Sequence, residues 1–240
     1  VDTDARMATD SEPVAVADTH LAGSGAFAPG SLVLGDRFRV ERLLGGGGMG
    51  LVYVAEQVSL GRKVALKVLR DDLLNTQGMG ERFRREALLL SSVEHPAVVR
   101  VIDFGQHGQS MCLVMEYVEG QSLQQLLERE APLSVERAER ILGQLAMGLA
   151  AIHAKGIVHR DLKPDNVMLT SSPDGQEQAR VLDFGIARLA EPDQRAQVTQ
   201  TGFVVGTPEY MSPEQAMGQT LDARSDLYAL GLIAFRMLTG

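Results

Sequence analysis

The sequence has 240 residues, of which 45% are hydrophobic and 22% charged, a composition that allows one large packed domain or two smaller ones. Its net charge of −8 argues against a nucleic-acid-binding surface, and its single cysteine excludes an internal disulfide framework. Every apolar run is shorter than the roughly 18 residues of a membrane span, and the N-terminus does not resemble a signal peptide. These features predict a globular protein without a membrane segment.

Residues 1–37 are predicted to be a disordered tail. The first 34 of them are rich in Ala, Asp, Ser, Thr and Gly, contain five acidic residues against one basic residue, and have almost no large apolar side chains. Such a segment cannot bury enough surface to offset the entropy that a chain loses on folding.

The next part of the chain has the pattern of a small antiparallel sheet with one helix. Five runs show strand-like alternation with β-branched residues: FRVERLL (38–44), GLVYVAEQ (50–57), KVALKVLR (63–70), AVVRVIDFG (97–105) and SMCLVMEYV (110–118). A helix over 80–92 interrupts them, with Phe83, Ala87 and Leu90 on one apolar stripe. Cys112, inside the last run, is expected to be a buried core residue.

Beyond residue 120 the pattern becomes helical. Ser134 can cap a long helix that ends at Lys155-Gly156. Its apolar stripe consists of Ala138, Ile141, Leu142, Leu145, Leu149 and Ile152. The loop IVHRDLKPDNVML (157–169) follows, dense in polar and charged residues between apolar stretches, and loops of this kind usually present side chains to a site. A strand then leads to Asp183, where a carboxylate would suit a hard cation.

The glycines of LLGGGGMGLV (43–52) allow two interpretations. Ordered glycine loses more backbone entropy than any other residue, so the run is either a slack linker or backbone that serves a ligand. The flanking strands are too close for a linker and must pair with each other, whereas a linker remains the better interpretation of residues 23–30. A single GxGxxG motif is weak evidence by itself.

Five motifs, in their order and spacing, resemble those of protein kinases. They are Gly45-x-Gly47-x-x-Gly50-x-Val52, Val64-Ala65-Leu66-Lys67, His159-Arg160-Asp161-Leu162 to Asn166, Asp183-Phe184-Gly185 and Ser212-Pro213-Glu214. The resemblance extends from about residue 38 to residue 240 and is strongest to bacterial serine/threonine kinases of the eukaryotic (Hanks) type. Asp103-Phe104-Gly105 spells the same tripeptide as the metal motif, but it precedes the catalytic loop and is predicted to be a turn.

The resemblance implies a nucleotide site for ATP and Mg²⁺. It assigns nucleotide binding to a set of residues from the glycine loop, the sheet, the hinge and the strand after the catalytic loop: Leu44, Gly45, Gly47, Gly50, Val52, Ala65, Lys67, Glu116, Val118 and Met168. Lys67 would hold the phosphates and pair with a carboxylate of the first helix. Glu86 is preferred over Glu81 for this pair, because Glu81 lies at the exposed start of the helix. The alternation of the strand places Lys67 and Ala65 on the face opposite Val64, Leu66 and Val68.

The resemblance also implies the catalytic roles. Asp161 would be the base that accepts the proton of the substrate hydroxyl, with Lys163 stabilising charge on the transferred group. Asn166 and Asp183 would hold magnesium. His159 is expected to have a structural role beneath Phe184.

The segment between Asp183 and Glu214 resembles an activation segment. Thr199 and Thr201 are candidate phosphorylation sites, because Arg160 is the kind of cation that orders a phosphorylated loop. Thr207 would contact the catalytic loop. Ser212 stands where the family usually has Ala, a change that we expect to have little consequence.

Together these features predict an α+β, bilobal protein-kinase fold. A five-stranded antiparallel N-lobe with one helix (38–115) would be joined by a hinge (115–120) to a mainly helical C-lobe (121–240). The implied function is ATP-dependent phosphorylation of serine or threonine in protein substrates, with autophosphorylation of the activation loop. The alternatives are a nucleotide-binding pseudokinase that acts as a scaffold, which the intact motif residues argue against, and a small-molecule phosphotransferase, which would lack the segment GTPEYMSPE.

The resemblance carries further expectations about context. A homodimer would allow autophosphorylation in trans, and the location would be cytoplasmic, with or without an anchor further along the chain. The catalytic domain is expected to be incomplete at its C-terminus, because the last helix, SDLYALGLIAFRML (225–238), is apolar around much of its circumference. Further helices of the family would cover it and supply an arginine to Glu214, which would otherwise be a buried carboxylate without its partner.

Overall fold

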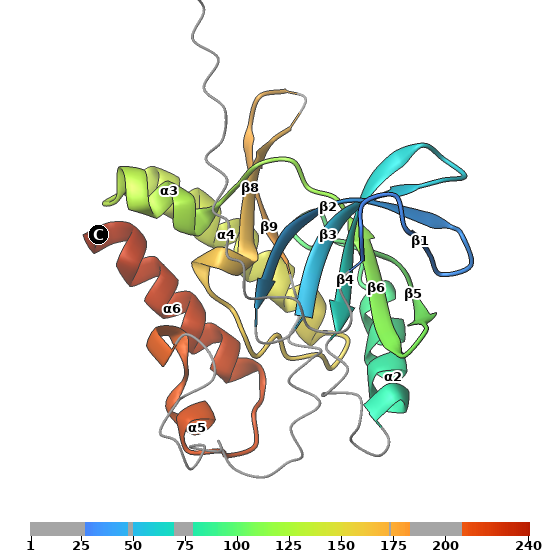
Figure 1. Ribbon diagram of the computed structural model, residues 1–240. Coiled ribbons are helices and arrows are strands. Elements are labelled where there is room, and N and C mark those ends of the chain that lie inside the picture. The colour runs from blue at the N-terminus through green and yellow to red at the C-terminus, as the bar shows by residue number, and fades with distance from the viewer. Residues whose placement is uncertain (1–26, 48–49, 70–78, 173, 183–207) are drawn as a thin grey trace, which may run out of the picture.

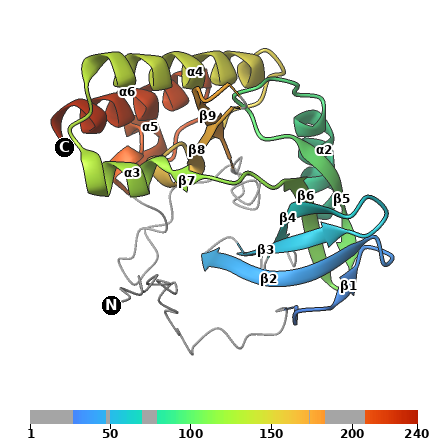
Figure 2. The same cartoon turned by 90° about the horizontal axis from the view of Figure 1, so that it is seen from above.

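In the computed structural model, which describes residues 27–47, 50–69, 79–172, 174–182 and 208–240, a strand-rich lobe lies beside a mainly helical lobe (Figure 1). The lobes are connected by the chain that leaves the sheet after Glu116 and reaches the first helix of the second lobe (Figure 2). The predicted bilobal α+β fold is therefore confirmed.

The N-lobe is a six-stranded antiparallel sheet with the strand order β1-β2-β3-β4-β6-β5. The strands are β1 (Leu32–Val33), β2 (Phe38–Gly47), β3 (Gly50–Gln57), β4 (Arg62–Leu69), β5 (Val101–His107) and β6 (Ser110–Glu116). Helix α2 (Met79–Ser91) follows β4 in the chain. The five predicted strands and the helix are confirmed, and β1 is an addition that the sequence pattern was too short to indicate.

The predicted tail extends too far, because residues 27–37 belong to the folded N-lobe. β1 pairs with β2, and Val33 and Leu34 are buried against it. The Phe27 ring packs edge-on against His107, and the Leu34 N–H donates to His107 Nδ1 at 3.3 Å. A few apolar residues thus offset the entropy cost at the sheet edge, although the surrounding composition is that of a tail.

The two faces of the sheet contribute to different cores. Val64, Leu66 and Val68 of β4 pack on one face together with Cys112. The other face carries Leu113 and belongs to a core cluster that includes the buried stripe of α2 and continues into the C-lobe. The predicted facing of β4 and the predicted burial of Cys112 are both confirmed, and burial raises the pKa of this thiol to about 12.

The C-lobe contains four helices and a small antiparallel sheet among its described residues. The helices are α3 (Leu123–Glu130), α4 (Val135–His153), α5 (Pro213–Ala216) and α6 (Ala223–Thr239), and the sheet consists of β7 (Gln121–Ser122), β8 (Val167–Ser171) and β9 (Glu177–Val181). The Ser134 side chain accepts a hydrogen bond from the Arg137 N–H and so caps α4, as predicted. The predicted stripe of α4 faces the core, and α4 packs against α6 and β9.

One face of α6 is buried and apolar side chains on its other faces are exposed, as expected for an apolar helix that further helices would cover. Ala229, Ile233 and Met237 face the core, whereas the Phe235 side chain is 67% exposed and Leu227 is 53% exposed. Of the helices in the described ranges, none is both long enough and apolar enough to cross a lipid bilayer.

The two lobes meet where β9 lies beside the connection from α2 to β5. The Val181 N–H donates to the carbonyl of Ala97 at 2.8 Å, and the Val99 N–H donates to the carbonyl of Val181 at 3.0 Å. The strand predicted to begin at residue 97 therefore begins four residues later, because these backbone groups bond to β9 instead of to the N-lobe sheet. This contact fixes the strand that leads to Asp183.

Candidate active site

The catalytic loop connects α4 to β8 and includes a short 3₁₀ turn, Pro164–Asn166. Its backbone bends sharply at Arg160, whose φ of 65° lies in the left-handed region that residues other than glycine rarely adopt. Asp226 at the start of α6 holds this bend, because its buried carboxylate accepts the N–H groups of His159 at 2.8 Å and Arg160 at 2.9 Å. His153 Nε2 lies 2.7 Å from the same carboxylate.

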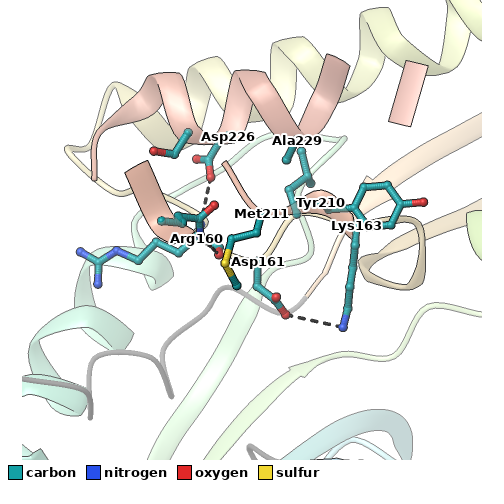
Figure 3. A pocket seen from close by; sticks show the side chains of 10 residues that line it. Arg160, Asp161, Lys163, Tyr210, Met211, Asp226 and Ala229 are labelled. Carbon is teal, nitrogen blue, oxygen red and sulfur yellow. Dashed lines mark hydrogen bonds and ion pairs between the residues drawn. The ribbon is translucent and has the colours of Figure 1, made fainter. Parts of the chain in front are cut away.

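Asp161, the proposed base, lies next to Lys163 and Asn166. Lys163 Nζ is 3.9 Å from Asp161 Oδ2. Figure 3 shows these two side chains pointing toward each other and the Arg160 side chain extending away from them. Asn166 Nδ2 donates to Asp161 Oδ2 at 3.1 Å and to the Asp161 carbonyl at 2.7 Å. Asn166 therefore holds the Asp161 carboxylate in one orientation.

Asn166 is oriented so that its amide oxygen remains for another partner. Both hydrogen bonds to Asp161 use Nδ2, which leaves Oδ1 on the opposite side of the amide group. An amide oxygen is a suitable ligand for a hard divalent cation, so Asn166 fits the predicted magnesium site. Among the described residues no group of three or more His, Cys, Asp and Glu could hold a metal ion. Asp183, the second predicted ligand, lies outside the described residues.

His159 connects the catalytic loop to the residue before Asp183. The ring is completely buried, and its Nδ1 accepts the Asp161 N–H at 3.3 Å. Nε2 therefore carries the proton and donates to the carbonyl of Leu182 at 2.8 Å. The Leu182 N–H in turn donates to the carbonyl of Asn166 at 2.8 Å. Leu182, the residue before Asp183, is thus fixed next to the catalytic loop by His159 and Asn166. This agrees with a structural role for His159.

Lys67 occupies the centre of the N-lobe sheet and is 3% exposed. Its strand β4 is hydrogen-bonded on both sides, and Lys67 lies opposite Val52 of β3 and Leu113 of β6. A lysine that is so deeply buried in a sheet is not a solvated surface charge, so it requires a specific role.

Glu86 is half-buried on α2, whereas Glu81 is exposed, so burial supports the choice of Glu86. Burial raises the pKa of the Glu86 carboxyl, and the charges of Arg160 and Arg85 act against this rise. No ion pair joins Glu86 to Lys67 among the described residues. In this structure the carboxylate lies instead in the field of the catalytic-loop arginine.

The glycine-rich segment is part of a hairpin and not a loose loop. β2 continues to Gly47, which pairs with Gly50 at the start of β3. A Cβ atom at Gly50 would lie 2.1 Å from the carbonyl oxygen of Val68, so the neighbouring strand requires glycine there. At Gly45 a Cβ atom would meet nothing within 4 Å, which leaves open space for a ligand over the sheet. The linker interpretation of these glycines is therefore excluded.

The residues predicted to hold the nucleotide come from several elements around the lobe junction. Leu44 of β2 is 43% exposed, and the remaining apolar members of the set are half-exposed: Val52, Ala65, Val118 and Met168. Partial exposure of apolar side chains on facing elements is typical of a ligand cleft.

The hinge is fixed by an arginine that the sequence analysis did not single out. Arg180 of β9 binds the Glu116 carboxylate through both terminal nitrogens, at 2.6 and 2.9 Å, and its Nε donates to the carbonyl of Pro96 at 3.1 Å. The backbone N–H of Glu116 donates to the carbonyl of Arg100 at 2.9 Å. One side chain thus connects the hinge, the α2–β5 connection and the strand before Asp183.

The structure overturns two expectations about Ser212-Pro213-Glu214. Ser212 is completely buried and caps α5, so replacing the usual alanine has a structural consequence. Glu214 is half-exposed and has a partner, since the Ser225 hydroxyl donates to Glu214 Oε1 at 2.6 Å and lowers the pKa of this carboxyl. The argument from a buried carboxylate without a partner is therefore wrong.

Several predicted residues lie elsewhere or outside the described ranges. Asp103 belongs to β5, at an irregularity in its pairing with β6, and forms an ion pair with Arg37. It is therefore a strand residue and not the predicted turn, and it is remote from the catalytic loop in the sequence and in the fold. The two candidate phosphorylation sites, Thr199 and Thr201, lie outside the described residues, as does Thr207.

Asp226 is a further functional residue that the sequence analysis missed. Its only signal in the sequence was an acidic residue inside an apolar helix, four residues after the Asp222 cap. A charge at a position that the helical pattern assigns to the core indicates a buried, hydrogen-bonded carboxylate.

Comparison with known proteins agrees with this geometry. Residues 38–240 match the family described as protein kinase domain. The chain belongs to the protein kinase family. The match to the family begins at residue 38, where the first predicted strand of the kinase domain begins.

Among individual relatives, the chain is 63% identical over 213 residues to the serine/threonine-protein kinase pkn2 of Myxococcus xanthus, covering 89% of the chain and 25% of that kinase. It is 43% identical over 211 residues to PknB of Mycobacterium tuberculosis, covering 86% of the chain and 33% of PknB. The chain thus spans a quarter to a third of the length of these relatives. The crystal structure of the Mycobacterium tuberculosis PknI kinase domain aligns with a TM-score of 0.70 at 30% identity, covering 89% of the chain and 77% of that structure.

Proposed function

We propose that the chain transfers the γ-phosphoryl group of ATP to serine or threonine hydroxyls of protein substrates. The observation that carries this proposal is the fixed Asp161 carboxylate, held by Asn166 and accompanied by Lys163, at the junction of the two lobes. Kinship with protein kinases supports the use of ATP and Mg²⁺ in general terms. The two named relatives are serine/threonine kinases, which supports that substrate class.

The proposed reaction is an in-line displacement at phosphorus. The substrate hydroxyl oxygen forms a bond to the γ-phosphorus while the bond from phosphorus to the β,γ-bridging oxygen breaks, and ADP leaves. The hydroxyl proton passes to the Asp161 carboxylate. Lys163, 3.9 Å from that carboxylate, supplies positive charge next to the transferred group.

The nucleotide is proposed to lie between the glycine hairpin and β8. Lys67 would bind its phosphates, and the open space at Gly45 allows the backbone to approach them. Adenine would contact the hinge backbone at Glu116 and Val118, with Leu44, Val52, Ala65 and Met168 around the ring. Asn166 and Asp183 would hold Mg²⁺, which neutralises charge on the phosphates when it is bound.

Glu86 remains the proposed partner of Lys67. No ion pair joins the two residues in the described part of the chain, so the proposal is that they pair when nucleotide binds. Arg160 would bind a phosphate on Thr199 or Thr201. A homodimer that phosphorylates these threonines in trans is part of the same proposal.

The proposal is tested by transfer of labelled phosphate from ATP to a generic basic protein, with the full-length protein as enzyme. Asp161→Asn and Lys67→Met should retain the fold, because they change charge and positioning rather than packing, but should lose activity by at least a hundredfold. Activity of either variant within threefold of the unmutated protein contradicts the assigned roles. Nucleotide binding without any transfer by the unmutated protein would favour a pseudokinase.

A further inference from the structure

The peptide group in front of Asp161 is fixed by a side chain from a distant part of the chain. Gln215 of α5 donates from Nε2 to the carbonyl oxygen of Arg160 at 2.7 Å. That carbonyl belongs to the peptide unit that joins Arg160 to Asp161. Its N–H group, on Asp161, donates to His159 Nδ1 at 3.3 Å, so both polar atoms of this unit are bonded to side chains.

This bond occurs where the backbone most needs support. Arg160 adopts a φ of 65°, which a residue with a side chain keeps only when its surroundings enforce it. On one side of the bend, the Arg160 N–H is held by Asp226 Oδ1 at 2.9 Å. On the other side, the Arg160 carbonyl is held by Gln215. The two side chains therefore hold the bend from opposite ends, and both line the pocket shown in Figure 3.

The orientation of the Gln215 amide follows from the cap of α5. Gln215 Oε1 accepts the backbone N–H of Ser212 at 3.0 Å, and the Ser212 hydroxyl accepts the backbone N–H of Gln215 at 3.3 Å. This reciprocal pair is a capping box. Because the amide oxygen is committed to Ser212, the NH₂ group must point to the other side, where Arg160 lies.

We propose that Gln215 is a positioning residue for phosphoryl transfer, which acts by fixing the peptide between Arg160 and Asp161 and so directing the Asp161 carboxylate. This inference rests on the proposed function. α5 follows the segment that carries Thr199 and Thr201 in the sequence, so the bond connects the end of that segment directly to the catalytic loop.

A substitution of Gln215 by Glu separates this role from the cap. Glu is the other residue that completes a capping box with serine, so Gln215→Glu preserves the cap of α5. A carboxylate has no hydrogen to donate, however, and its charge repels the Arg160 carbonyl. Gln215→Ala removes the donor to Arg160 and the side-chain half of the capping box, while the Ser212 hydroxyl can still accept the backbone N–H of residue 215.

Gln144 provides a matched control. Like Gln215, it is half-buried and makes one bond from each end of its amide to backbone: Nε2 donates to the carbonyl of Glu177 at 3.1 Å, and Oε1 accepts the Ala179 N–H at 2.7 Å. These bonds go to β9 and not to the catalytic loop. Gln144→Ala thus removes the same kind of contact at a different place.

The experiment measures kcat and the KM for ATP of the full-length protein, with a serine- or threonine-containing protein substrate, together with the melting temperature. We expect Gln215→Glu to lower kcat at least tenfold, with KM for ATP within threefold and melting within 3 °C of the unmutated protein. We expect Gln215→Ala to lower both kcat and the melting temperature, and Gln144→Ala to leave kcat within twofold.

A kcat of Gln215→Glu within twofold of the unmutated protein overturns the positioning role while the proposed function stands. The positioning role is also overturned if Gln144→Ala lowers kcat as much as Gln215→Glu does, because the effect would then not depend on a contact with the catalytic loop. If the unmutated protein transfers no phosphate, the proposed function fails first, and the positioning role fails with it.

Discussion

Substitution of Asp226 by Asn should destabilise the protein strongly and leave the catalytic loop without its main support. The carboxylate is 1% exposed and accepts the N–H groups of His159 and Arg160 at 2.8 and 2.9 Å, with His153 Nε2 2.7 Å away. An asparagine is nearly the same size, so the change alters hydrogen bonding rather than packing.

The magnitude follows from the bonds that change. A hydrogen bond to a charged group contributes about 1.5–3 kcal/mol and a neutral one about 0.5–1.5 kcal/mol, so three weakened bonds lose about 3 kcal/mol together. The new NH₂ group also faces one of the buried donors and leaves it unsatisfied, which costs about 1–3 kcal/mol more. A total of about 4–6 kcal/mol is a large part of the roughly 5–15 kcal/mol by which most domains are stable.

The assay is urea unfolding followed by far-ultraviolet circular dichroism, because the chain has no tryptophan to report by fluorescence. Asp222→Asn is the matched control: Asp222 caps the same helix, is exposed, and is replaced by another good capping residue. The free energy of unfolding of Asp222→Asn should change much less than that of Asp226→Asn. If Asp226→Asn is no more destabilising than Asp222→Asn, the reasoning about the buried carboxylate is refuted.

Three further outcomes are expected. Burial raises the pKa of the Cys112 thiol from 9.0 to about 12, so the native protein should react with a thiol reagent only at the rate of unfolding, and rapid native-state labelling would contradict the burial. Above pH 9 the thiol ionises in the unfolded chain but stays protonated in the folded one, so the free energy of unfolding should fall as pH rises from 9 to 12. Arg180→Ala should raise the KM for ATP severalfold more than it lowers kcat, because the hinge loses its clamp on Glu116; the charge exchange Arg180→Glu with Glu116→Arg should recover part of the loss, and no recovery would argue against the pairing. Incubation with Mg-ATP should place phosphate on Thr199, Thr201 or both, as peptide mass spectrometry can show; full activity with phosphate only outside residues 186–214 would exclude control by this segment.

The overall fold was predictable because its signals are local and repeated. The alternation of β4 placed Lys67 on the face opposite Val64, and the capped, periodic pattern after Ser134 gave α4. Motif order then supplied the arrangement of the lobes, which no local pattern contains. The structure confirms these elements closely.

The contacts that the sequence did not predict are long-range bonds made by single polar side chains. Arg180, Gln215 and Asp226 each act on backbone or side chains far away in the sequence, and a side chain of this kind produces no periodic pattern. Ser212 was misjudged for the same reason: comparison with the usual alanine considered its size, whereas its function is a hydrogen bond in a capping box. The influence of the Arg160 charge on Glu86 was not predicted either, because the catalytic loop and α2 are far apart in the sequence.

The most direct test of the account compares the two Asp-Phe-Gly tripeptides. We propose that Asp183 holds Mg²⁺, because it directly follows Leu182, whose carbonyl accepts a hydrogen bond from His159, whereas Asp103 forms an ion pair with Arg37 in the N-lobe. The measurement is the rate of phosphate transfer from Mg-ATP to protein by Asp183→Asn and Asp103→Asn, side by side. We expect the first variant to lose at least a hundredfold and the second to remain within twofold of the unmutated protein; equal activities, or the reverse order, would contradict the location of the site.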